Sequence, residues 1–354
     1  MPAERQVVFG KRTALIEEEI QKVVTDDGAP LALVHKRAAE IGSYSPLSTK
    51  LAGVNLILIH GLGQNRLTYD LPAISPANYF AEMSMEVWIA ELRGHGLSRE
   101  LGSPVPESFE DYIKLDVPAI LRHISMVNDK PIFVLGHSLG GTILYCLDPN
   151  TCGNVAGFIS VAGPYHFAKG LFLFRLMSFI LHHTYRLNPL QLLASKDIPF
   201  PLAPFSKVFK GGRFLFDHPK FPQLYRIWQP QSMSDEILAD RLDRGFDQTS
   251  LAVVKRMILW ASTGRLTDGD GNAVYDEVFK AKSQPFFFVQ GSGDSSVPLK
   301  SIQCALDSYE GPRTLRIFGS ADGEPDFGHI DLLTGNDAPK YTWPAILEWM
   351  AEQL

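Results

Sequence analysis

The sequence has little cysteine, no long hydrophobic run and no excess of positive charge. Its 354 residues include three cysteines, Cys146, Cys152 and Cys304, and none of them forms a C-x-x-C pair. A disulfide framework and a zinc site are therefore both disfavoured, and we interpret the three as small buried hydrophobic side chains. The net charge of −6 provides no electrostatic basis for a nucleic-acid partner. We expect neither a metal nor any other cofactor.

No stretch of the sequence predicts a membrane span. The first 20 residues are charged and lack the continuous apolar core of a secretory signal. The most apolar run elsewhere, residues 171–181, is interrupted by Arg175, and it is shorter than the roughly 20 apolar residues that a spanning helix needs. We expect a cytoplasmic protein without an integral membrane segment. The same run leaves a peripheral lipid contact as an open alternative, and the oligomeric state is not predicted.

Residues 131–141, PIFVLGHSLGG, contain the strongest motif of the chain. Residues 132–135 form an apolar, partly β-branched run that is typical of a buried parallel strand. The next five residues, from Gly136 to Gly140, match G-x-S-x-G, and the apolar residues 142–147 predict a helix. A strand, a tight turn and a helix are the context in which such a serine acts as a nucleophile. We therefore expect Ser138 to project its hydroxyl above the sheet.

Apolar runs alternate with helical spacing along most of the chain. This rhythm predicts an α/β fold, in which a mostly parallel sheet is covered by helices on both faces. A turn around residues 26–30 predicts a leading antiparallel hairpin formed by residues 18–24 and 31–35. Pro118 is expected to kink or split the helix predicted over 108–124. The remaining predicted strands are 54–59, 86–91, 155–162, 285–290 and 314–318, and the remaining predicted helices are 75–85, 301–308 and 340–353.

The rhythm changes between residues 165 and 281. This segment is rich in phenylalanine and proline, it contains no long buried strand, and residues 235–244 and 250–261 predict helices. We therefore predict a core formed by residues 1–164 and 282–354, interrupted by a mainly helical insertion at 165–281. The two halves of the core together continue one sheet.

A serine hydroxyl needs a base, and the base is usually an imidazole that a carboxylate orients. His329 follows the predicted strand 314–318, and Asp294 follows the predicted strand 285–290. Both would lie outside the carboxyl ends of their strands, where catalytic groups gather in this architecture. The chain order Ser138, Asp294, His329 is the order expected for a nucleophile elbow.

Other residues compete weakly for these two roles. His60 and His95 stand beside glycines at strand ends, where hydrogen bonding to loops is the ordinary role, and His137 is expected to point into the core. Asp322 and Asp326 are alternative orienting acids close to His329. Two further histidines, His182 and His183, lie in the insertion. The run that contains Asp268 and Asp270 resembles a calcium-binding loop, but the downstream residues do not have the spacing of calcium ligands, so we interpret it as a turn.

The tetrahedral intermediate of acyl transfer needs hydrogen-bond donors for its oxyanion. The backbone N–H of Leu139 directly follows the expected nucleophile. The second donor is expected to come from the loop after the strand 54–59, at Leu62. The flanking Gly61 and Gly63 would allow this backbone to approach closely.

Taken together, these segments resemble the α/β-hydrolase superfamily, in particular its lipase-like branch, which includes acid lipases and polyhydroxyalkanoate synthase-related hydrolases. The resemblance implies that Ser138 is the nucleophile, His329 the base and Asp294 its orienting acid, and that the insertion is a cap. The polymer synthases have cysteine at the elbow, so serine here favours hydrolysis over chain growth. The resemblance rests on the segments 58–63, 66–71, 88–98, 136–141, 293–294 and 328–333.

The sequence thus predicts a serine hydrolase that cleaves carboxylic esters with a hydrophobic acyl or alcohol part through an acyl-enzyme. An acyltransferase, thioesterase, amidase, lactonase or C–C hydrolase would use the same parts. Haloalkane dehalogenases and epoxide hydrolases are disfavoured, because they need a carboxylate at the position of Ser138. A ligand-binding receptor or an inactive scaffold with this fold is the non-enzymatic alternative.

Overall fold

The computed structural model describes residues 7–13, 15–40, 45–167, 199–201, 207, 210–222, 226–269, 274–319, 321 and 323–354. Two of the sequence predictions, His182 and His183, fall outside these residues. So do Asp270, Asp322 and the apolar run 171–181. In the part of the chain that is described, no helix combines the length and the apolarity needed to cross a bilayer.

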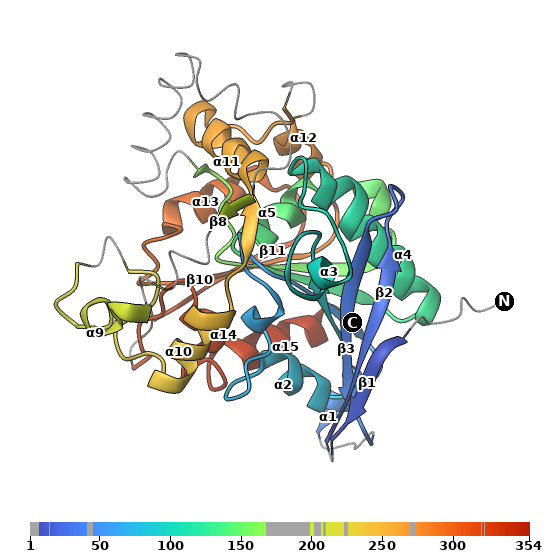
Figure 1. Ribbon diagram of the computed structural model, residues 1–354, viewed down its shortest axis with the longest axis horizontal. Coiled ribbons are helices and arrows are strands. Elements are labelled where there is room, and N and C mark those ends of the chain that lie inside the picture. The colour runs from blue at the N-terminus through green and yellow to red at the C-terminus, as the bar shows by residue number, and fades with distance from the viewer. Residues whose placement is uncertain are drawn as a thin grey trace.

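One large sheet organises the described residues. Its nine strands follow the order β1-β2-β3-β5-β4-β6-β7-β10-β11. All pairs from β5 to β11 are parallel, whereas β1, β2, β3 and β5 pair antiparallel at one edge (Figure 1). The strands are β1 Val7–Arg12, β2 Ile16–Val24, β3 Pro30–Ala38, β4 Asn55–Ile59, β5 Glu86–Glu91, β6 Ile132–His137, β7 Val155–Val161, β10 Phe286–Gly291 and β11 Arg313–Phe318.

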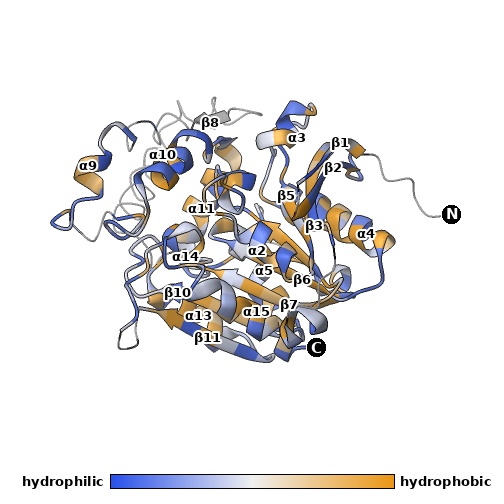
Figure 2. Ribbon diagram, turned by 90° about the horizontal axis from the view of Figure 1, so that it is seen from below, coloured by the Kyte–Doolittle hydropathy of each residue, from blue (hydrophilic) through white to orange (hydrophobic). Residues whose placement is uncertain are grey.

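Successive side chains of each strand point to opposite faces of the sheet and belong to two separate hydrophobic cores, one on each face. On β4, Leu56 and Leu58 join the first core, while Ile57 and Ile59 join the second. Because successive side chains of a strand point to opposite faces, a strand that is apolar throughout needs cover on both sides. Figure 2 accordingly shows hydrophobic strands in the middle of the molecule and helices of mixed hydropathy around them.

Helices supply this cover on both faces. The first core takes residues from α2 Pro76–Glu82, α10 Asp235–Arg244, α14 Asp331–Thr334 and α15 Thr342–Glu352. The second core takes residues from α4 Val117–Val127, α5 Leu139–Cys146, α11 Leu251–Thr263, α12 Tyr275–Lys280 and α13 Leu299–Ser308. The shorter elements are α1 Pro46–Lys50, α3 Gly96–Glu100, α9 Arg213–Phe216, η1 Arg66–Thr68, η2 Tyr112–Asp116, η3 Pro149–Thr151, and the paired strands β8 Pro199–Pro201 and β9 Gln248–Ser250.

This architecture confirms the predicted α/β fold with its mostly parallel sheet, and several details differ. The leading hairpin carries a third antiparallel strand, β1, that the sequence did not predict. As predicted, the helix around Pro118 is divided, into the π-helical η2 and the α-helix α4. Pro118 lies in the first turn of α4, where its missing N–H costs nothing. Cys146 and Cys152 are buried as expected, but Cys304 is only partly buried, which corrects that expectation.

Candidate active site

Ser138 lies at a sharp turn between β6 and α5. Its backbone has φ 55° and ψ −120°, a left-handed conformation that is strained for a residue with a side chain. The glycines around it make the turn possible. A Cβ on Gly136 would lie 2.3 Å from the backbone of Gly140, and a Cβ on Gly140 would lie 2.3 Å from the carbonyl oxygen of Ile59. The elbow therefore has the geometry that the motif predicts.

Asp294 and His329 are brought together from two neighbouring loops. His329 Nδ1–H donates to Asp294 Oδ2 over 2.9 Å, and both side chains are buried. The other carboxylate oxygen of Asp294 accepts from the backbone N–H groups of Ser296 and Val297, at 2.8 and 2.9 Å. These bonds fix the carboxylate, and the carboxylate in turn fixes the tautomer and orientation of the imidazole.

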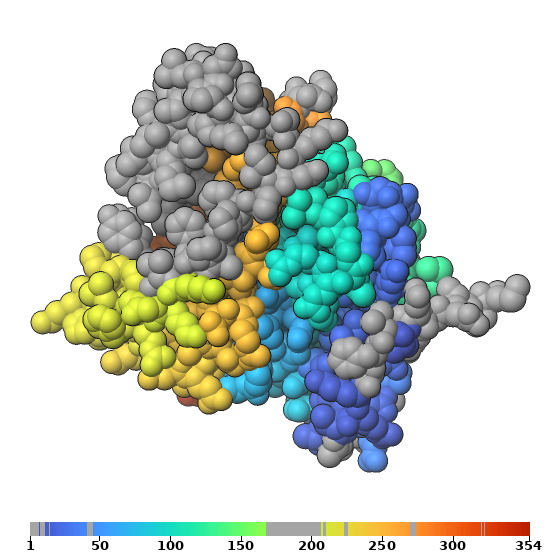
Figure 3. Space-filling view, viewed as in Figure 1, coloured from blue at the N-terminus to red at the C-terminus, as the bar shows by residue number. Residues whose placement is uncertain are grey.

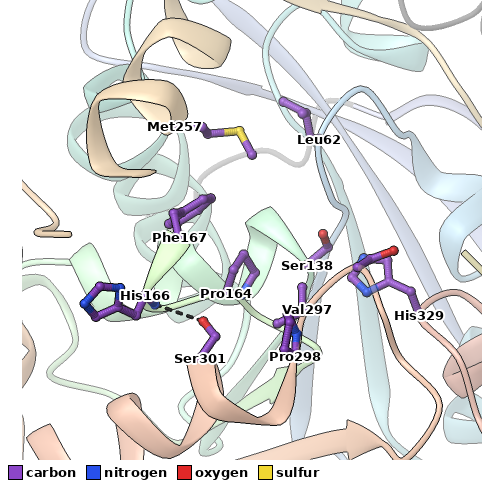
Figure 4. A pocket seen from close by; sticks show the side chains of 11 residues that line it. Leu62, Ser138, Pro164, His166, Phe167, Met257, Val297, Pro298, Ser301 and His329 are labelled. Carbon is purple, nitrogen blue, oxygen red and sulfur yellow. Dashed lines mark hydrogen bonds between the residues drawn. The ribbon is translucent and has the colours of Figure 1, made fainter. Parts of the chain in front are cut away.

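Ser138 and His329 line the same pocket, which has a volume of about 210 Å³. Figure 4 shows the Ser138 hydroxyl and the His329 ring at one end of this pocket. The walls are mainly apolar and come from both the sheet loops and the segment 165–281. They are formed by Leu62, Pro164, His166, Phe167, Met257, Ser296, Val297, Pro298 and Ser301.

The loop after β4 packs directly against the elbow, and we call residues 60–65 the β4 loop. A Cβ on Gly61 would lie 3.0 Å from Ser138 Cβ, and Gly63 has a positive φ of 56°. Leu62 lines the pocket, and Leu139 is the first residue of α5. No acceptor within the described chain takes the backbone N–H of either leucine. Both groups thus have hydrogen-bonding capacity to offer near Ser138.

The competing histidines lie beneath these loops. The imidazole of His60 contacts the Gly61 carbonyl through Nδ1 and the Leu92 N–H through Nε2, and burial lowers its pKa to about 4. His95 contacts the Tyr112 hydroxyl, and burial holds its pKa well below the usual range. Neither residue lines the pocket, so both occupy the loop-supporting positions that we considered ordinary for them.

His137 and the alternative acid Asp326 also have defined places. His137 is fully buried, as expected, and its Nε2–H donates to the backbone carbonyl of His329 over 3.0 Å. Burial keeps its pKa well below the usual range, so it is neutral at pH 7. Asp326 accepts a hydrogen bond from the Ser292 hydroxyl at the surface, 2.8 Å away. Asp268 directly follows Thr267, which forms an antiparallel bridge with Val274.

A second set of residues, which the sequence analysis missed, holds the His329 loop. Asp331 is fully buried and accepts from the backbone N–H groups of Gly328 and Gln229, and burial raises its pKa to about 6. The backbone N–H of His329 donates to Ile227, and the Gln229 side chain donates to the carbonyl of Gly293. Residues 227–229 thus join the Asp294 loop to the His329 loop. Asp331, two positions after His329, is the sequence signal from which this support of the His329 loop could have been predicted.

In the residues that the structure describes, no three histidine, cysteine, aspartate or glutamate side chains are grouped closely enough to hold a metal ion. The side chains and backbone groups described above define the chemistry that the site itself offers. It comprises a hydroxyl on a strained turn, an imidazole paired with a carboxylate, and two unclaimed backbone N–H groups.

The fold and the elbow together define a hydrolase of the α/β type. A model of the alpha/beta hydrolase family matches residues 56–321. The chain belongs to this family, which confirms the resemblance drawn from the sequence. Comparison with curated proteins found no match.

Solved structures share the fold at low sequence identity. DcsB, in a complex with its substrate analogue, superposes with a TM-score of 0.59 at 16% identity, covering 95% of this chain and 100% of that one. A monoacylglycerol lipase from Paleococcus ferrophilus gives a TM-score of 0.55 at 13% identity, with 86% and 97% covered. A lipase-esterase related protein from Clostridium acetobutylicum gives 0.52 at 15% identity, with 92% and 99% covered.

Proposed function

We propose that this chain is a serine hydrolase that cleaves carboxylic esters with a hydrophobic acyl or alcohol part. The proposal rests on one observation: the hydrogen-bonded pair Asp294–His329 lines the same apolar pocket as Ser138, which stands on a strained elbow. Family membership and the lipases and esterases among the similar structures support hydrolysis.

The first half of the reaction forms an acyl-enzyme. His329 Nε2 removes the proton of the Ser138 hydroxyl as its oxygen attacks the ester carbonyl, and Asp294 stabilises the imidazolium that results. The oxyanion is stabilised by the N–H groups of Leu62 and Leu139, and each donor contributes on the order of 10²–10³ in rate. The imidazolium then gives its proton to the leaving alcohol, and the bond between carbonyl carbon and alcohol oxygen breaks.

The second half repeats these roles with water. His329 removes a proton from a water molecule, whose oxygen attacks the acyl carbon. The bond to the Ser138 oxygen breaks, the proton passes back to that oxygen, and the carboxylic acid leaves. Each residue returns to its starting state, and one cycle consumes one ester and one water molecule and releases an alcohol and a carboxylic acid.

We also propose that residues 165–281 form a cap over this pocket. Phe167 and Met257 come from this segment and face the same cavity as Leu62 and Val297 of the core (Figure 4). Their apolar surfaces favour an acyl or alcohol group without charge. Each methylene that becomes buried in such a pocket contributes about 0.8 kcal/mol, which corresponds to about a fourfold gain in rate.

A fluorophosphonate probe tests the proposal. It is expected to label the wild-type chain at Ser138, and Ser138→Ala should abolish both labelling and the turnover of p-nitrophenyl esters. With acyl chains of increasing length, kcat/KM should rise from acetate until the chain outgrows the cavity of about 210 Å³. A chain that is not labelled, and that hydrolyses no ester, would overturn the assignment in favour of a binding protein. Thioesters and lactones in the same screen separate the related enzymes.

A further inference from the structure

Arg241 is a buried cation without a described counter-charge. It lies on α10 with 1% of its surface exposed, and its Nη2 donates to Gln64 Oε1 over 3.2 Å. Its Nε and Nη1 find no hydrogen-bond partner among the described residues, and none of the described carboxylates pairs with it. Burial lowers its pKa to about 10, so it remains charged at pH 7. An unpaired buried charge costs several kcal/mol of stability, which points to a role other than stabilising the fold.

The side chain of Gln64 links this cation to the β4 loop. Its Oε1 accepts from Arg241 Nη2, from the backbone N–H of Gly61 at 3.3 Å and from the Thr68 hydroxyl at 3.0 Å. The backbone N–H of Gln64 donates back to the Gly61 carbonyl over 3.2 Å. One carboxamide oxygen therefore holds the start of the loop that presents Leu62, and the guanidinium fixes that oxygen.

The chain that follows Arg241 reinforces the same contact, and we call residues 241–247 the loop clamp. The N–H of Asp247 donates to the Gly63 carbonyl over 2.7 Å, and Gln64 and Phe246 form an antiparallel bridge. The Asn65 side chain donates to the Arg244 carbonyl over 2.7 Å. Figure 3 shows the yellow-orange segment around α10 against the light-blue segment that follows β4. The segment 165–281 thus contributes directly to the shape of the β4 loop.

The field of Arg241 crosses the β4 loop. After burial, the guanidinium is a further cause that lowers the pKa of both His60, the first residue of the β4 loop, and His137, which precedes Ser138 at the elbow. In a buried environment of low effective dielectric constant, a positive charge at this position also favours negative charge on the far side of the loop. Arg241 does not line the pocket, so it acts through the loop and not by touching substrate.

We propose that Arg241 is a positioning residue for ester hydrolysis, which fixes the β4 loop through Gln64 and places a buried positive charge behind the developing oxyanion. The inference rests on the proposed function and adds to it a contribution from the segment 165–281. Because the oxyanion exists only in the transition state and the intermediates, the residue acts on kcat and leaves KM unchanged.

The test compares Arg241→Met, Arg241→Lys and the control Arg213→Met. Arg213 lies on α9 and forms an exposed ion pair with Asp235, which is on α10 like Arg241. Arg241→Met is expected to lower kcat for p-nitrophenyl esters at least tenfold with KM within twofold, while its resistance to urea stays equal or increases. Arg241→Lys should recover part of kcat, because the charge is kept. Arg213→Met should behave as the wild type.

A trifluoromethyl ketone, which forms a tetrahedral adduct with an anionic oxygen, gives the second readout. Its Ki should rise in Arg241→Met by the same factor by which kcat/KM falls, since both report binding of the oxyanion. Absence of fluorophosphonate labelling in the wild type would overturn the hydrolase assignment. If the wild type is labelled normally, two results would overturn the role of Arg241 alone. The first is that kcat and Ki are unchanged in Arg241→Met, and the second is that kcat falls only together with the resistance to urea.

Discussion

Ser138 combines chemical exposure with backbone strain. A non-glycine residue with φ 55° and ψ −120° costs on the order of 1–3 kcal/mol. The surrounding contacts hold it there: the backbone N–H of Ser138 donates to Val161, and those of Gly141 and Thr142 donate to Ser138. In this conformation the side chain of Ser138 lines the same pocket as that of His329.

Asp294→Asn separates the proposed orienting acid from its neighbour. The amide would keep its acceptor contacts with the N–H groups of Ser296 and Val297, but it would offer an N–H to His329 Nδ1 and select the wrong tautomer. We expect kcat to fall by about 10³–10⁴ with the fold intact. Asp326→Asn, at the exposed alternative acid, should leave kcat within twofold. Steady-state kinetics with one p-nitrophenyl ester decides, and the reverse pattern would transfer the role to Asp326.

Glu91 gives the protein a pH-dependent stability. Its pKa is raised from 4.5 to about 7, first by burial and further by Asp247, against the opposing effect of Arg66. The folded state therefore binds more protons than the unfolded state between these values, so the free energy of unfolding falls as pH rises from 4.5 to 7. Glu91→Gln has no proton to lose, so its free energy of unfolding should not show this decrease. Urea unfolding should show it more stable than the wild type by up to about 3 kcal/mol at pH 8, with no difference at pH 4.

At the scale of elements, close contacts between β4, β6 and α5 decide where the reactive groups meet. Gly136, Gly140 and Gly141 each lie so near to neighbouring backbone or side chains that a Cβ would fall within 3 Å of another atom. The start of α5 can therefore reach the end of β4, next to the loop that carries Leu62. The sequence predicted a tight turn at Gly136 and Gly140 and a close backbone approach at Gly61 and Gly63, but it did not predict the contact between Gly140 and Ile59.

Gly140→Ala tests the contact between elements. The new Cβ would lie 2.3 Å from the carbonyl oxygen of Ile59, so α5 must shift away from β4. Overpacking of this kind costs about 1–3 kcal/mol, and the shift should lower kcat with it. Gly153→Ala is the matched control, because nothing lies within 4 Å of its added Cβ. Chemical unfolding with both variants checks the prediction, and equal stabilities would refute it.

The elements that the sequence missed are the short ones. The strands with continuous apolar runs, β4 to β7 and β10, were all anticipated, whereas α3, α12 and α14 were not. Helices of four to six residues are marginal on their own and exist because neighbouring elements fix them. In α14, the Asp331 side chain accepts from the N–H of Gly328, three positions before it, and from the N–H of Gln229 in a distant segment. No local pattern predicts the second of these contacts.

For the molecule as a whole, the antiparallel extension β1–β3 is tied to the parallel part by buried charge. Arg93 Nε donates to Asp116 over 2.7 Å, and its Nη1 donates to Asp27 over 2.8 Å. Asp27 belongs to the β2–β3 turn, and Asp116 lies fully buried before α4, where burial raises its pKa to about 6. One guanidinium thus joins the edge of the sheet to its helical cover.

Arg93→Gln would leave the Asp116 carboxylate buried without its cation. Loss of one member of a buried pair costs about 3–5 kcal/mol, so the free energy of unfolding in urea at pH 7.5 should fall by this amount. Arg122→Gln is the control. Arg122 pairs at the surface with Asp26, the residue before Asp27, and 52% and 65% of the two side chains are exposed. Such a pair contributes less than about 1 kcal/mol. Similar losses in the two variants would contradict the distinction.

The difference between what the sequence reveals and what only the structure shows follows from distance along the chain. Ser138, Asp294 and His329 each follow a recognisable strand, so the topology of a parallel sheet was enough to predict that they converge. Arg241 and Gln64 are 177 positions apart, and neither stands in a motif. The helical spacing of residues 235–244 predicts that Arg241 lies in a helix. It does not predict which loop that helix contacts, because this contact depends on the packing of the whole chain.

The loop clamp has a practical consequence for protein engineering. The segment 165–281 contributes Phe167 and Met257 to the pocket, so exchanging it for a segment from another enzyme would change the pocket lining. Here the donor fragment would also have to replace the hydrogen bonds that residues 241–247 make to Gly63, Gln64 and Asn65. A graft that ends before residue 241 keeps the native support of the β4 loop, and one that extends past residue 247 must rebuild it.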